Sequence, residues 1–207
     1  MFSTILIAVA TMVTMTEAHG KYKACEYSEL TKCNKVFMSG FTNSPQSTDM
    51  SDYCTAFQKY GDCLTQTKDC KGKFIDLDRF MILQHMWVDK ELLVCKNHNI
   101  DGLTSVVNAH KKYRKEFEKV LKLSADKGDI FEGCAETIHK DCSRKMATDL
   151  RSDPRMCIGV SNFLDCYEKP GKKCKAKIYK DFADITKKVA KELVKMFKSK
   201  KGVMPNC

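Results

Sequence analysis

Hydrophobic positions along this chain recur at spacings of three and four residues, which is the period of an α-helix with one buried face. Two clear stripes are Tyr53, Phe57, Tyr60 and Leu64, and then Cys157, Val160, Leu164 and Tyr167. The strict alternation that would indicate strands is almost absent. We therefore predict an all-α fold.

Three longer helices complete the predicted pattern. One contains the stripe from Ile178 to Leu193, and a matching stripe between Leu77 and Leu92 is interrupted by the polar residue Gln84. A further amphipathic helix over residues 104–123 has no counterpart later in the chain. Because turn-forming residues precede and follow it, we expect this helix to connect two parts of the protein.

The cysteines reveal a duplication. In each half, six cysteines follow one another with intervals of 7, 20, 8, 6 and 24 residues in the first and 7, 14, 8, 7 and 32 in the second. Two intervals are identical and a third differs by one residue, which is typical of a tandem repeat. The twelve positions are Cys25, Cys33, Cys54, Cys63, Cys70, Cys95, Cys134, Cys142, Cys157, Cys166, Cys174 and Cys207.

The start of the chain predicts secretion. An apolar run from Ile5 to Val13 precedes the small-residue pattern that ends at Ala18, as in a cleaved signal peptide. The later apolar segment from Phe80 to Cys95 contains several charged residues, so we expect no membrane-spanning helix. The predicted organisation is a signal peptide over 1–18, a module over 19–96, a linker with the connector helix over 97–128 and a second module over 129–207. One shared core and two separate cores are equally compatible with the sequence.

Twelve cysteines in an oxidising compartment predict six structural disulfides. Helix geometry excludes a bond between Cys54 and Cys63, because nine residues of helix separate Cα atoms by about 13 Å. The same reasoning excludes Cys25 with Cys33. In each module, ten of the fifteen pairings that six cysteines allow remain open.

The first module resembles a known family. Its Cys-x7-Cys step, the segment Cys-Thr-Ala-Phe-Gln-Lys-Tyr-Gly-Asp-Cys-Leu and the final long helix are similar to the secreted invertebrate domain of unknown function nineteen, best known from nematodes. The resemblance covers Cys25 to Cys95 and, more loosely, Cys134 to Cys207. It implies an extracellular helical module without an assigned activity, and it transfers no site residues.

Charge supplies the main functional hypothesis. The formal net charge is +10, and twelve lysines lie between Pro170 and Gly202 against three acidic residues. Such a basic amphipathic helix is either a solvated outer face or a surface for acidic partners. The predicted contact surface consists of Lys180, Lys187, Lys188, Lys191, Lys195 and Lys198. An extracellular protein, a sulfated glycan or an anionic surface would fit it, and no nucleic acid is expected because no recognised motif accompanies the lysines.

Signs of catalysis and of metal binding are weak. The chain has no GxSxG, HExxH or phosphate-binding glycine loop, and its five histidines are scattered. A metal site at the cysteines would need closer spacing, and copper binding by an N-terminal His19 is a minor hypothesis. We therefore predict a secreted, non-enzymatic interaction protein without a cofactor, of the kind represented by effectors and venom components. The alternative is a carrier whose cavity, lined by Phe80, Met81, Met86, Trp87 and Phe117, holds a lipid or an odorant.

Overall fold

The computed structural model describes residues 23–41, 50–125 and 134–171, together with seven single positions between 174 and 194. Every regular element in these ranges is a helix, which confirms the all-α prediction. The elements are α2 (Ala24–Ser39), α3 (Ser51–Gln66), α4 (Lys73–Glu91), α5 (Asp101–Asn108), α6 (Lys111–Ala125), α8 (Cys134–Ser152) and α9 (Met156–Gly171). The predicted signal peptide, residues 1–18, lies outside the described residues.

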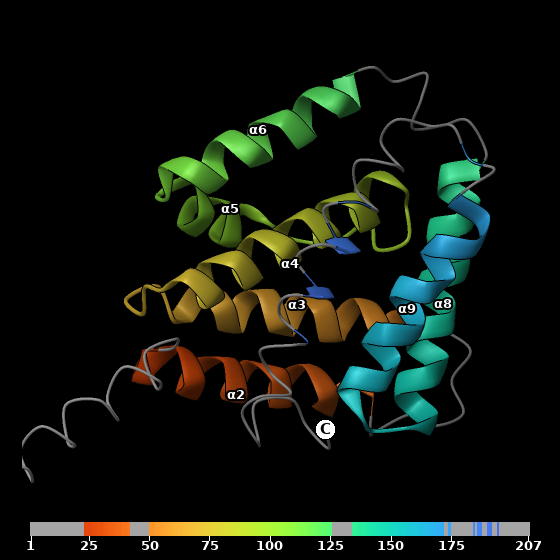
Figure 1. Cartoon of the computed structure of the whole chain (residues 1–207), viewed down its shortest axis with the longest axis horizontal. Helices are drawn as coiled ribbons and strands as arrows, with labels where there is room; N and C mark the ends of the chain where they lie inside the picture. The colour runs from red at the N-terminus through yellow and green to blue at the C-terminus, as the bar shows by residue number, and fades with distance from the viewer. Residues whose placement is uncertain are drawn as a thin grey trace, which may run out of the picture.

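Helices α2, α3 and α4 run side by side, and α5 and α6 lie against α4 on the side away from α2 (Figure 1). The α8–α9 pair crosses one end of this stack at a steep angle. The end of α2 lies very close to α3, since a Cβ atom added to Gly40 would lie 2.6 Å from the Cβ atom of Ala56. The first module is therefore a tightly packed layer onto whose end the second helix pair docks.

The helix predicted over 104–123 is two helices in the structure. The chain turns at Ala109 and His110, between α5 and α6. On one straight helix, Val107 and Tyr113 would differ by about 120° in direction, because six residues rotate by roughly 600°. The turn lets both residues be buried, and the Tyr113 ring stacks on Phe80 of α4 with centroids 5.5 Å apart. Packing onto the first module thus decides where this helix breaks.

The two halves of the chain share one hydrophobic core. Buried residues from α2 to α9 form a single cluster. At the contact, the His85 ring of α4 lies 5.3 Å from that of Phe163 in α9. Close by, Arg151 of α8 makes a two-pronged ion pair with Asp52 of α3, and both side chains are less than a tenth exposed. Of the two arrangements that the sequence left open, the structure has the shared core.

The loop between α3 and α4 is fixed by a buried arginine. Arg79, 2% exposed, donates hydrogen bonds to the carbonyl oxygens of Leu64, Thr67 and Cys70 and pairs with Asp76. The start of α4 is capped by a side chain from another helix, because Oε1 of Glu26 in α2 accepts from the backbone N–H groups of Phe74 and Ile75. These bonds join α2, α3 and α4 at one end of the layer.

Candidate functional site

The disulfides repeat the same connection in both modules. In the first module, Cys25 pairs with Cys70, Cys33 with Cys63 and Cys54 with Cys95. In the second, Cys134 pairs with Cys174 and Cys142 with Cys166, so the first cysteine again joins the fifth and the second joins the fourth. Cys157 is also disulfide-bonded, and Cys207 lies outside the described residues. Each of these five described bonds links two helices or a helix to a segment outside the helices, as the excluded pairings require.

The predicted basic surface is described only in part. Lys187 and Lys191 are the members within the described residues, whereas Lys180, Lys188, Lys195 and Lys198 fall outside them. The Nζ atom of Lys187 lies 2.8 Å from Oε1 of Glu168 in α9, and that of Lys191 lies 3.7 Å from the same oxygen. This pairing lowers the pKa of the Glu168 carboxyl. Part of the lysine charge therefore faces a carboxylate of the protein itself.

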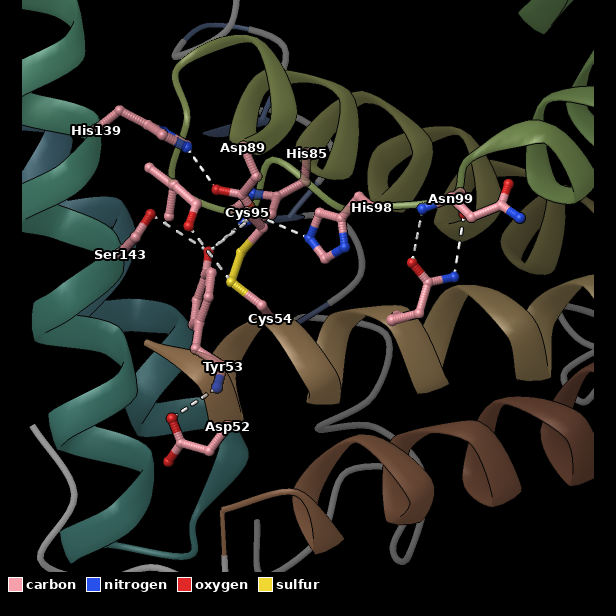
Figure 2. Close-up of a disulfide and its surroundings, with 12 residues drawn as sticks. Asp52, Tyr53, Cys54, His85, Asp89, Cys95, His98, Asn99, His139 and Ser143 are labelled. Carbon is pink, nitrogen blue, oxygen red and sulfur yellow. Dashed lines mark hydrogen bonds and ion pairs between the residues drawn. A yellow bond between two sulfur atoms is a disulfide. The ribbon is translucent and has the colours of Figure 1, made fainter. Parts of the chain in front are cut away.

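A buried polar cluster lies where the two modules meet (Figure 2). At its centre, fully buried Asp89 of α4 accepts a hydrogen bond from Nε2 of His139 in α8 over 2.7 Å. The hydroxyl of Tyr53 in α3 lies 2.6 Å from Nε2 of His85 and 3.3 Å from both Asp89 and Ser143. These contacts bring side chains from α3, α4 and α8 into one network.

Burial governs ionisation in this cluster. It lowers the pKa of His85 to about 4, because a charged imidazole there would lose its hydration, although the Asp89 carboxylate opposes the shift. For Asp89, burial favours the neutral form, but attraction to His85, the hydrogen bond from His139 and the nearby imidazole of His98 outweigh it and lower the pKa of the carboxyl. At neutral pH the Asp89 carboxyl is therefore ionised and the His85 imidazole is uncharged.

This cluster does not suit metal binding or catalysis. Asp89, Cys95 and His98 are close enough in the described part of the chain to share an ion, but the sulfur of Cys95 is bonded to Cys54 and cannot act as a thiolate. The carboxylate already has two hydrogen-bonding neighbours, and no cleft opens onto it among the described residues. We assign the cluster to the junction of the two modules. The ionisable residues within the apolar segment 80–95 were the signal for it, but the sequence could not show which partners they meet.

The cavity at the module junction is small. It measures about 60 Å³, and its lining is almost entirely apolar, with contributions from α2, α3, α4, α8, α9 and three residues near the end of the chain. An apolar cavity that holds benzene measures roughly 150 Å³, so this space is too small for a lipid or an odorant of ordinary size. Of the five side chains predicted to line a carrier cavity, only Met81 contacts it. The geometry of the described residues does not favour the carrier hypothesis.

None of the helices in the described part of the chain combines the length and the apolar character that a bilayer crossing requires.

Part of the first module is similar to a known protein family. Residues 28–90 match the family model described as the repulsive guidance molecule (RGM) N-terminal domain. No curated protein and no solved structure matches the chain.

This match corrects the predicted resemblance to the nematode-type domain of unknown function nineteen, which is wrong. That prediction depended on cysteine spacing and a few aromatic residues, without a longer stretch of matching sequence. The match covers most of α2, all of α3 and nearly all of α4. Of the six cysteines of the first module it includes Cys33, Cys54, Cys63 and Cys70, whereas Cys25 and Cys95 lie outside it. The first module is a disulfide-rich helical domain similar to the RGM N-terminal domain, as expected of an extracellular interaction protein.

Proposed function

We propose that this protein is a secreted, non-enzymatic interaction protein that binds an acidic extracellular partner through lysine-rich surfaces. The observation that carries the proposal is the formal net charge of +10 on a disulfide-linked helical protein. Residues 28–90 of this protein are similar to a domain of a guidance molecule. Disulfides persist in oxidising compartments, which places such a domain in the secretory pathway or at the cell surface. An excess of positive charge attracts anionic partners and accelerates their encounter.

The proposed organisation keeps the modules of 19–96 and 129–207, with residues 97–128 between them. The repeated first-to-fifth and second-to-fourth disulfides support a duplication, because ten pairings were open to the first module. The shared core means that the two modules present their surfaces as one body. A partner can therefore contact both modules in a fixed arrangement.

The proposed contact surface in the second module is the lysine-rich segment with Lys180, Lys187, Lys188, Lys191, Lys195 and Lys198. Binding of fluorescently labelled protein to intact cells, measured by flow cytometry at low and physiological salt, tests it. The variant Lys188→Glu/Lys195→Glu/Lys198→Glu should lower the apparent affinity by about tenfold, since each reversal replaces attraction by repulsion.

The control variant reverses the exposed lysines Lys35, Lys59 and Lys90 of the first module, which changes the net charge equally. It should bind cells almost as the natural sequence does. Cell binding that is absent at low salt, or equally weakened in both variants, would contradict the proposal.

A further inference from the structure

A large, positively charged cleft opens at the end of the first module farthest from α8 and α9. It has a volume of about 840 Å³. Its walls are the residues before α2, the loop between α3 and α4, and the turn between α5 and α6. Helices α2, α4 and α6 all begin at this end of the molecule (Figure 1). None of the described residues that line the cleft belongs to the lysine-rich segment near the end of the chain.

Five lysines surround the cleft: Lys23, Lys68, Lys71, Lys73 and Lys112. All five are exposed, and none forms an ion pair with another described residue. The cleft also contains two aspartates, but Asp76 is paired with Arg79. Lysines from three separate segments (residue 23, residues 68–73 and the start of α6) therefore line the same space, and among the described residues of the lining only Asp69 is an acidic group without an ion-pair partner.

The helix starts add to this positive potential. The first turn of a helix carries a partial positive charge, which attracts anions within a short distance. At α4 the side chain of Glu26 already accepts from two of these N–H groups, and Gly72 lets it approach so closely that an added Cβ would lie 2.0 Å from the carboxyl carbon. The lysines, rather than the start of α4, are thus the groups available to a ligand.

The lining indicates the chemical class of that ligand. Lysine binds the oxygens of phosphate, and by the same point charge those of sulfate, without a fixed geometry, whereas the planar fork of arginine is the group that holds carboxylates in a bidentate arrangement. The one arginine in the cleft, Arg79, is buried and uses its donors within the protein. Single-stranded nucleic acids need exposed aromatic rings for stacking, but Tyr113 is only 7% exposed and already stacks on Phe80.

We propose that this cleft binds a sulfated polysaccharide chain, with Lys68, Lys71 and Lys112 among the groups that contact the sulfates. The inference rests on the proposed function only in placing the protein outside the cell, where such glycans occur. A cleft of this size lies within the range of pockets that bind small ligands, so it can hold a few sugar units of a longer chain.

Isothermal titration of the full-length protein with a sulfated heparin oligosaccharide at physiological ionic strength tests the inference. The variant Lys68→Glu/Lys71→Glu/Lys112→Glu should bind at least about tenfold more weakly, because three attractive charges become repulsive. The matched control is again Lys35→Glu/Lys59→Glu/Lys90→Glu, which should change the affinity less than about threefold because these lysines lie outside the cleft. Circular dichroism and the mass of the intact disulfide-bonded chain confirm that each variant is folded.

Two further probes separate the ligand classes. The same oligosaccharide without its sulfates should not bind, and polyglutamate should not compete with the sulfated form. Equal loss in the cleft variant and the control, competition by polyglutamate, or no binding by the natural sequence would each overturn the inference. Cell binding that depends on Lys188, Lys195 and Lys198 would still support the proposed function in those cases, so the two proposals can fail independently.

Discussion

Asp78 in α4 is a carboxyl whose removal should make the protein more stable at alkaline pH. Its side chain is 1% exposed, and burial raises the pKa from the ordinary 3.8 to about 7, although the hydrogen bond from Tyr60 and the charge of Arg79 oppose the shift. The second carboxylate oxygen has no hydrogen-bond partner among the described residues. The fold therefore favours the protonated acid.

The sign and size of the effect follow from this shift. A raised pKa means that the folded protein binds the proton more tightly, so the contribution to stability is complete below about pH 3.8 and is lost as the pH rises through about 7. Three pKa units correspond to about 4 kcal/mol in total, of which about 3 kcal/mol falls between pH 5 and 8.5. Asp78→Asn keeps the shape and an oxygen that can accept from Tyr60, but it removes this titration.

Urea unfolding followed by circular dichroism at pH 5 and pH 8.5 measures the difference. Relative to the natural sequence, Asp78→Asn should gain about 3 kcal/mol between these two pH values. The variant must be compared with the natural sequence at each pH, because His85 also makes the stability of the protein depend on pH. Its pKa is lowered to about 4, so the folded protein loses stability as the pH falls below about 6.5, which is the opposite direction.

The control is Asp165→Asn, which makes the same chemical change at an exposed position. It should leave the pH dependence unchanged. If the free energies of unfolding of Asp78→Asn and the natural sequence run parallel with pH, burial does not disfavour the Asp78 carboxylate and the reasoning is refuted.

Three other substitutions test the packing. Arg151→Met should lower the free energy of unfolding by about 3–5 kcal/mol, because it leaves Asp52 buried without its partner. Adding Asp52→Leu should recover much of that loss in a double-mutant cycle, and additive losses would contradict the reasoning. Gly40→Ala should cost about 1–3 kcal/mol in urea unfolding, because the new Cβ collides with Ala56, whereas unchanged stability would show that α2 can move away. Leu93→Gly should raise the free energy of unfolding by about 0.5–1 kcal/mol, because Leu93 has a φ of 58° at the end of α4, a conformation that glycine adopts more easily. Leu93 is 62% exposed, so little packing is lost, and a loss of stability would show that its side chain contributes to the fold.

The end of α4 shows why the last of these effects is local. The N–H of Val94 donates to the carbonyl of Asp89, and the N–H of Leu93 donates to that of Lys90, which is the hydrogen-bond pattern of a Schellman motif. This motif requires a left-handed residue at Leu93, a place usually taken by glycine. The turn directs Cys95 back to α3, where it bonds to Cys54.

The sequence by itself determined the helical class, the register of the two cysteine sets and the buried stripe of α3. These properties depend on side-chain spacing within one segment or on the count of residues between cysteines, so they can be read before the chain is folded. Tyr53, Phe57, Tyr60 and Leu64, predicted as one stripe, are all buried in α3.

Tertiary structure alone decided which cysteines pair, where the connector helix breaks and how the two modules share a core. Each of these depends on groups far apart in the chain: the contact between Asp89 and His139 spans fifty residues and that between Asp52 and Arg151 spans ninety-nine. The cleft is a similar case. Its lysines come from three segments whose charges are unremarkable one by one, and only the common end at which α2, α4 and α6 begin brings them together.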